Sequence, residues 1–145
     1  IHSFRHPLDN ILSIYRAHFA TGNRFASSLT DCAKVYALHT RILNIYKELY
    51  GNKIYSLDYD LLVSEPNIVI RKLINWLQWE WNDSYLSPHL NQRSVSTASV
   101  IAVRSPINKK SSGGWRKYKQ MLIPAIEQLV IYEEFAYLKS ELDQS

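Results

Sequence analysis

The stretch IHSFRHPLDNILSIYRAHF, residues 1–19, decides the fold because it changes from a strand pattern to a helix pattern within a few residues. IHSF is typical of the end of a buried strand. Pro7 suits a first helical turn, where its missing N–H would have no partner in any case. The apolar residues at helical spacing after it are Leu8, Ile11, Leu12, Tyr15 and Phe19. We therefore expect a strand followed at once by a helix, with Asp9, Ser13 and Arg16 together on a polar face.

Two further segments extend this beginning into an α/β pattern. A second helix is predicted from about Ser28 to Tyr50. Its predicted core-facing stripe consists of Val35, Leu38, His39, Ile42, Ile45, Tyr46 and Leu49. KIYSLD, residues 53–58, is short, alternating and β-favouring, which predicts a second strand. A strand, a helix and a strand in this order are typical of a parallel sheet.

The remainder is predicted to be helical around one long irregular segment. DYDLLVSEP, residues 58–66, is expected to turn the chain, and Pro66 opens a third helix. The tryptophans near the end of that helix, which we expect to serve mainly in packing, are Trp76, Trp79 and Trp81. Residues 82–114 have no periodicity, which is typical of a functional or disordered loop. A last helical region is expected from about Trp115, with an interruption at Pro124.

Length and composition indicate one domain. The chain has 145 residues, of which 46% are hydrophobic, enough for a real core. No apolar run approaches the ~20 residues that a membrane-spanning helix requires. Residues 1–4 do not have the pattern of a signal peptide, and the expected location is cytoplasmic. The single Cys32 cannot form an internal disulfide.

The charge of the chain predicts an anionic partner. The formal net charge is +4, and no acidic residue lies between Asp83 and Glu127. The seven basic residues of that interval are Arg93, Arg104, Lys109, Lys110, Arg116, Lys117 and Lys119. A nucleotide, a nucleic acid or an acidic protein would all fit this charge, and composition does not choose among them.

The junction of the first strand and helix is a candidate anion site. Arg5 ends the strand and Ser13 lies on the helix that follows. Free N–H groups and the helix dipole favour negative charge at a helix start, while arginine offers a two-pronged donor for phosphate and serine a short neutral one. Ligands of open α/β sheets bind at this edge. In the alternative interpretation, Arg5 pairs with Asp9 and Ser13 has no ligand.

Three ordered blocks of the chain resemble a known family. They are RHPLDNILSIYRAHF (residues 5–19), SLDYDLLVSEPNIVIRKLINWLQWEW (56–81) and RSVSTASVIAVRSPINKKSSGGWRKYKQML (93–122). This series resembles the second half of sulfotransferases that use 3′-phosphoadenosine 5′-phosphosulfate (PAPS). The resemblance is strongest to those linked to tetratricopeptide repeats (TPR) and to the tyrosylprotein sulfotransferases.

The resemblance implies the fold class. It is α/β, the C-terminal part of a P-loop-NTPase-like sulfotransferase domain, helix-rich with a short parallel sheet. Residues 1–145 would be a partial domain, the half that binds the 3′-phosphonucleotide. In the family, the loop for the 5′-phosphosulfate and the usual catalytic base precede the strand with which this chain begins. The catalytic residues are therefore expected upstream of Ile1, and this chain alone is expected to be inactive.

The resemblance also implies roles for particular residues. Arg5 and Ser13 match the pair that holds the 3′-phosphate, and Arg16 is a candidate for a second phosphate-binding arginine that the family has one residue later. Tyr59 matches a tyrosine beside the nucleotide. The residues that match the loop lining the nucleotide are Ser99, Val103, Pro106, Ile107 and Asn108.

One position departs from the family pattern. The family usually has Arg or Lys immediately before the tryptophan of the last block, where this chain has Gly114. Lys109, Lys110 or Arg116 are candidates to compensate for the missing cation. The basic segment 104–119 is predicted to close over the nucleotide, with Gly113 and Gly114 as its hinge.

The implied ligands are PAPS and its product adenosine 3′,5′-bisphosphate (PAP), without a metal. The five histidines have no metal-ligand spacing. The acceptor would be a hydroxyl of a protein tyrosine, a glycan or a small molecule, and a parent protein could carry a TPR region. A eukaryotic tyrosylprotein-type enzyme would work in the Golgi lumen. Two alternatives stay open: a non-enzymatic basic module for nucleotides or, less favoured, nucleic acid, and a degenerate sulfotransferase fold used for interaction.

Overall fold

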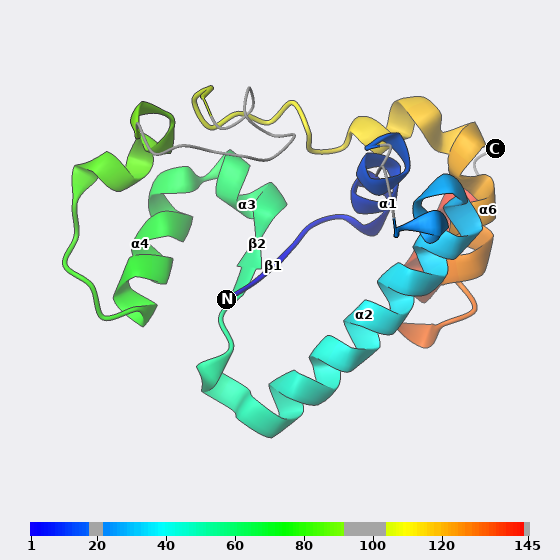
Figure 1. Ribbon diagram of the computed structural model, residues 1–145, viewed down its shortest axis with the longest axis horizontal. Coiled ribbons are helices and arrows are strands. Elements are labelled where there is room, and N and C mark those ends of the chain that lie inside the picture. Colours follow the sequence, from blue (N-terminus) through cyan, green and yellow to red (C-terminus); the bar gives the residue numbers. More distant parts are fainter. Residues whose placement is uncertain (18–21, 92–103, 144–145) are drawn as a thin grey trace. The chain divides into compact units, whose positions relative to one another are not determined.

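The computed structural model describes residues 1–17, 22–91 and 104–143. It divides into two compact units, each of which is described by itself. The first unit consists of Ile1–Phe4 and Tyr55–Ser111, and the second of Arg5–Ile54 and Ser112–Ser145. Figure 1 shows the elements of both units in the colours of the sequence.

The first unit contains a parallel pair of strands. Its elements are β1 (His2–Phe4), β2 (Ser56–Asp58), α3 (Tyr59–Ser64), α4 (Pro66–Trp76) and the 3-10 helices η3 (Asp83–Leu86) and η4 (Pro88–Leu90). The strands pair in parallel, with Ser3 opposite Leu57. A parallel pair needs a long crossover connection, and the chain between the strands supplies it with a helical segment. The predicted fold class, helix-rich α/β with a short parallel sheet, is confirmed.

Two expectations for the first unit are wrong. Residues 59–64 form the helix α3 rather than a turn, because the Asp58 side chain caps it by accepting from the Leu61 N–H at 3.1 Å. Trp79 does not serve in packing, since 59% of it is exposed. The other two tryptophans do pack: the ring centroids of Trp76 and Tyr55 lie 5.3 Å apart, and Trp81 lies under the Arg71 guanidinium, whose carbon is 3.9 Å from the ring centroid.

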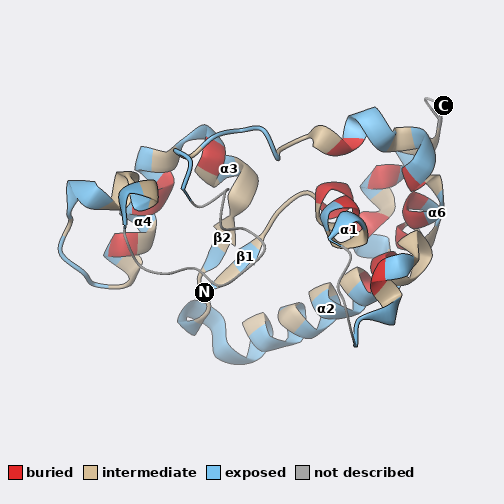
Figure 2. Cartoon of the chain, turned by 45° about the horizontal axis from the view of Figure 1, so that its top comes forward, coloured by how far each residue is buried: buried red, intermediate tan, exposed pale blue. Residues whose placement is uncertain are grey.

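The second unit is a cluster of helices. Its elements are α1 (Pro7–Arg16), η1 (Arg24–Ser27), α2 (Leu29–Tyr50), η2 (Gly51–Lys53), η5 (Gly114–Tyr118), α6 (Lys119–Leu129), η6 (Glu133–Lys139) and α7 (Ser140–Asp143). The fully buried large side chains of its core are Leu8, Ile11, Cys32, Trp115, Leu122, Ile126, Leu129 and Leu138. Figure 2 shows the buried residues gathered on α1, on α6 and on the end of α2 beside them.

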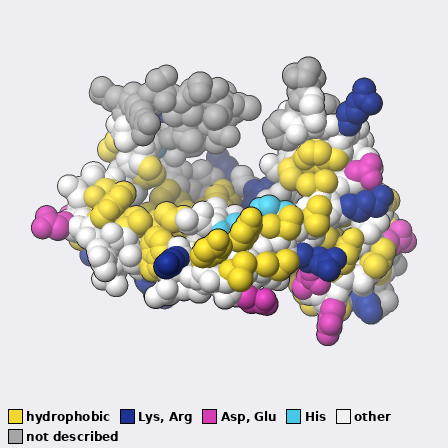
Figure 3. Space-filling model, turned by 60° about the horizontal axis from the view of Figure 1, so that its bottom comes forward, with side chains coloured by type: hydrophobic (Ala, Val, Ile, Leu, Met, Phe, Trp, Pro, Cys, Tyr) yellow, Lys and Arg dark blue, Asp and Glu magenta, His cyan; other side chains and the backbone are white. Residues whose placement is uncertain are grey.

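The predicted orientation of α2 is wrong. The residues of α2 that enter the core are the small ones, Cys32, Ala33 and Ala37. The apolar members of the expected stripe are exposed, from 40% at Val35 to 69% at Leu49. Small side chains let α1 and α6 approach α2 closely, whereas the larger ones form a row on the face seen in Figure 3. Helical spacing correctly identified apolar residues that share one face of α2, but it does not show whether that face is buried or exposed.

The last helical region is also more continuous than expected. Helix α6 runs through Pro124 without a break. Proline removes one helical hydrogen bond. Burial of Leu122, Ala125 and Ile126 on the side that faces the core compensates for that loss. Among the described residues, no helix combines the length and the apolar character that crossing a bilayer requires.

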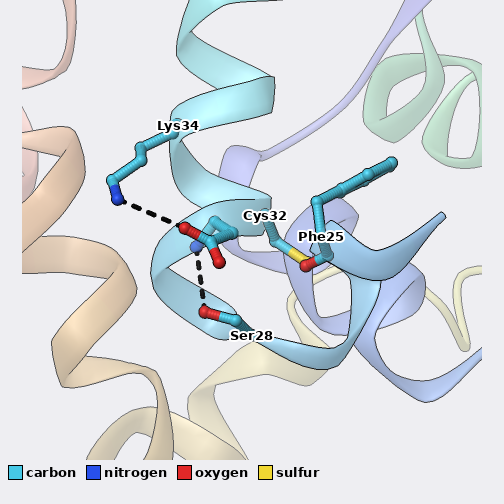
Figure 4. A network of polar contacts seen from close by, with 5 residues as sticks. Phe25, Ser28, Cys32 and Lys34 are labelled. Carbon is cyan, nitrogen blue, oxygen red and sulfur yellow. Dashed lines mark hydrogen bonds and ion pairs between the residues drawn. The ribbon is translucent and has the colours of Figure 1, made fainter.

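Cys32 lies at the start of α2, where local polar contacts fix it. Its Sγ lies 3.3 Å from the Phe25 carbonyl oxygen, to which it donates. Ser28 caps the helix by accepting from the Asp31 N–H at 3.2 Å, and Asp31 pairs with Lys34 (Figure 4). Burial raises the pKa of the Cys32 thiol, and the neighbouring charge of Asp31 raises it further.

We expect this thiol to be almost unreactive in the folded protein. A raised pKa reduces the thiolate fraction at pH 8, and burial blocks access. Alkylation by iodoacetamide at pH 8 is expected to be about a hundredfold slower in buffer than in guanidinium, because labelling requires local opening. Mass spectrometry measures both rates on the single cysteine. Equal rates would contradict the buried position.

Candidate functional site

Arg5 is held beside the first turn of α1. It lies directly after β1 and is half-buried. Its Nη2 donates to the backbone carbonyl of Asp9, and the Tyr36 hydroxyl donates to the Arg5 carbonyl at 3.2 Å. His6 caps the helix by accepting from the Leu8 N–H at 3.3 Å. The guanidinium is thereby held against the first turn of α1.

Asp9 is the residue of this region whose role the sequence did not reveal. It is 3% exposed although it is charged. Its carboxylate accepts from the backbone N–H of Gly113 at 2.6 Å and of Trp115 at 2.8 Å. Arg5 thus pairs with Asp9, as in the alternative interpretation, but through the backbone oxygen. The carboxylate binds residues 113–115, called here the GGW segment.

The GGW segment and η5 run along α1. The His6 ring stacks on Trp115, with centroids 4.9 Å apart and planes 6° from parallel. Farther along α1, the Arg16 guanidinium carbon lies 5.6 Å from the Tyr118 ring centroid. Ser13 lies between Asp9 and Arg16 in the sequence, on the same side of the helix, and is exposed. We call Asp9, Ser13 and Arg16 the polar face of α1.

This arrangement brings cations from two parts of the chain to α1. Arg5 and Arg16 belong to the α1 region, and Arg116 and Lys117 are exposed on η5. The Arg116 guanidinium carbon lies 5.0 Å from the Trp115 ring centroid. Helix α1 also directs the positive end of its dipole toward Arg5. Such a set of donors can hold a phosphate.

The other predicted nucleotide residues lie in the first unit. Tyr59 is the first residue of α3 and is half-buried. Asn108 forms a tight turn: its side-chain nitrogen donates to the Pro106 carbonyl at 2.9 Å, and its oxygen accepts from the Lys110 N–H at 3.2 Å. Ile107 is half-buried, and Lys109 and Lys110 are exposed. Ser99 and Val103 lie outside the described residues.

The two glycines of the expected hinge differ. Gly113 has a φ of 72°, in the left-handed region, whereas Gly114 does not have a positive φ. Trp115 is buried, and the protein's own carboxylate holds the segment. This end of the basic segment is thus anchored to α1. Among the described residues, no group of three or more His, Cys, Asp or Glu could hold a metal ion.

Comparison with known proteins shows the family of the chain. The model of the sulfotransferase family matches residues 1–83, which include β1, Arg5, the polar face of α1 and Tyr59. The chain belongs to the sulfotransferase family. An uncharacterized protein of Aquifex aeolicus (strain VF5) is 34% identical to this sulfotransferase chain over 142 residues. The match covers 96% of the chain but 18% of that relative, so the chain spans about a fifth of the relative's length.

The left-handed turn at Gly113 predicts different effects of alanine at the two glycines. Gly113→Ala is expected to reduce the free energy of unfolding by about 1–2 kcal/mol, because a Cβ disfavours a positive φ. The matched control is Gly114→Ala, whose Cβ would meet the nearest atom, Asp9 Oδ1, at an ordinary 3.7 Å. Urea denaturation measures both variants. Equal stabilities would contradict the turn.

Proposed function

We propose that this chain is the part of a PAPS-dependent sulfotransferase that binds the 3′-phosphonucleotide. The observation that carries the proposal is the junction of β1 and α1, where Arg5 lies against the first helical turn and Ser13 is exposed on the next turns. A guanidinium and a hydroxyl beside a helix N-terminus bind phosphate by charge, by directed hydrogen bonds and by the helix dipole. The family membership supports this choice among anions.

Each residue has a proposed task. Arg5 and Ser13 hold the 3′-phosphate, and Arg16 adds positive charge on the same face. Tyr59 and the segment Pro106–Lys110, with Ser99 and Val103, line the rest of the nucleotide. The acceptor is a hydroxyl of a protein tyrosine, a glycan or a small molecule, and no metal takes part. A sulfuryl group moves from PAPS to that hydroxyl, leaving PAP.

The reaction needs groups that these 145 residues do not supply. Transfer requires donors around the sulfonate and a base for the acceptor hydroxyl. The sequence contains no G-x-x-x-x-G-K-[ST] loop. We therefore propose that residues 1–145 bind the nucleotide without transferring sulfate. The kinship with TPR-linked and tyrosylprotein sulfotransferases, a TPR region in the parent protein, and a cytoplasmic or Golgi location belong to the same proposal and rest on the resemblance of the three blocks.

Nucleotide binding tests the proposal. The protein is expected to bind PAP more tightly than adenosine 5′-phosphate, because only PAP carries the 3′-phosphate. Arg5→Ala is expected to weaken PAP binding by about ten- to a hundredfold, the loss of one charged hydrogen-bonding contact. Isothermal titration calorimetry measures both constants.

The matched control is Arg41→Ala, which removes an exposed arginine of α2 in the same unit. It is expected to leave the preference for PAP intact. An Arg5→Ala protein that still prefers PAP would place the 3′-phosphate elsewhere. Affinity that increases with the length of a nucleic acid and falls steeply with salt would favour the basic binding module instead.

A cation at position 114 is expected to strengthen the same site. Gly114 has an ordinary backbone conformation and space for a Cβ, so the fold accommodates a side chain there. Gly114→Arg is expected to tighten PAP binding by about tenfold through one added charged contact. Gly114→Gln, which has similar length without the charge, is the control. Equal PAP affinities of the two variants would mean that a side chain at position 114 does not contact the phosphate.

A further inference from the structure

We infer that Asp9 is a positioning residue of the phosphate site: it fixes the GGW segment on α1 so that the cationic helix η5 lies along the polar face. The inference rests on the proposed function. It concerns a carboxylate that does not bind the nucleotide itself. It accounts for a buried acidic side chain within a region that otherwise gathers positive charge.

The contacts of Asp9 connect both sides of the site. Its backbone oxygen accepts from the Arg5 guanidinium, and its carboxylate accepts from Gly113 and Trp115. These partners come from chain segments more than 100 positions apart. One residue therefore sets both the direction of Arg5 and the starting point of η5.

The geometry of the turn fits this role. The left-handed conformation of Gly113 lets the N–H groups of residues 113 and 115 converge on one carboxylate. Beyond the turn, Trp115 is buried against His6, and Tyr118 lies beside Arg16. The helix η5 between these contacts thus has a defined course along α1. Without the carboxylate, the buried N–H group of Trp115 and the half-buried one of Gly113 would lose their partner.

Charge alone predicts the opposite effect. A carboxylate near a phosphate repels it, so removing the negative charge would strengthen anion binding if Asp9 had no other role. A positioning role predicts weaker binding, because asparagine keeps one accepting oxygen but has an NH2 group in place of the other, and that group cannot accept from an N–H. The sign of the change in PAP affinity therefore decides between the two.

The test compares Asp9→Asn with Asp31→Asn. Asp31 lies in the same unit at the start of α2, and its replacement removes the same charge. Asp9→Asn is expected to weaken PAP binding about tenfold and to reduce the preference for PAP over adenosine 5′-phosphate. Asp31→Asn is expected to leave that preference unchanged. Calorimetry on the folded variants measures the four dissociation constants, those of each variant for PAP and for adenosine 5′-phosphate.

Each result has a separate meaning. If Asp9 had a purely structural role, Asp9→Asn would weaken the binding of both nucleotides equally and leave the preference for PAP unchanged. That result would overturn the inference, and so would tighter PAP binding by this variant. A wild-type protein without any preference for PAP would overturn the proposed function itself.

Amide hydrogen exchange of the wild-type protein gives a test that needs no variant. The N–H groups of Gly113 and Trp115 are expected to exchange slowly without nucleotide, in contrast to that of the exposed Lys109. Rapid exchange of both would overturn the inference even if Asp9→Asn failed to fold.

Discussion

The second unit depends on a buried carboxylate that joins the beginning of the chain to its last third. Asp9 lies in the first turn of α1, and its bonds to Gly113 and Trp115 close a loop of about a hundred residues. Burying a charge is unfavourable unless it is hydrogen-bonded, and here each carboxylate oxygen accepts one short N–H bond. Once Trp115 is fixed, α6 follows directly and packs on α1 and α2. The core of the unit is thus positioned by a polar contact and stabilised by apolar ones.

Local sequence patterns correctly predicted where several helices begin and which side of α1 is buried. Pro7, Ser28 and Pro66 each mark a helix start found in the structure, and the spacing of Leu8, Ile11 and Leu12 identified the buried side of α1. For α2 the same reasoning selected the wrong side. Helix packing there depends on small residues such as Ala33 and Ala37, whose weak hydrophobicity hardly contributes to a stripe. Which side of an amphipathic helix is covered depends on its neighbours, and those are not encoded in its own periodicity.

For the candidate site, too, the sequence predicted some residues and missed another. Arg5 directly follows β1 and Ser13 lies on the helix that begins two residues later, so the order strand end, arginine and helix serine followed from the sequence. The role of Asp9 could not be predicted, because its partners are backbone N–H groups of residues 113 and 115, and a backbone donor has no sequence signature. A faint signal existed: the GGW segment lies in the longest stretch without acidic residues, and a tryptophan after two glycines needs an anchor. The sequence therefore predicted the cationic residues but not the Asp9 contacts that position them.

In the proposed function, the anchored turn leaves side chains rather than its own backbone N–H groups to bind the phosphate. Converging N–H groups beside a left-handed glycine commonly form an anion site. Here the turn already holds an internal anion, the Asp9 carboxylate, so the N–H groups of Gly113 and Trp115 are occupied. A phosphate at α1 then depends on Arg5, Ser13 and the cations around them. Binding through guanidinium groups on exposed or half-buried side chains responds to salt and to the charge of the ligand. In the proposed function, discrimination of a 3′-phosphate therefore depends on the number and placement of cations, and for this reason we expect a cation at position 114 to affect affinity.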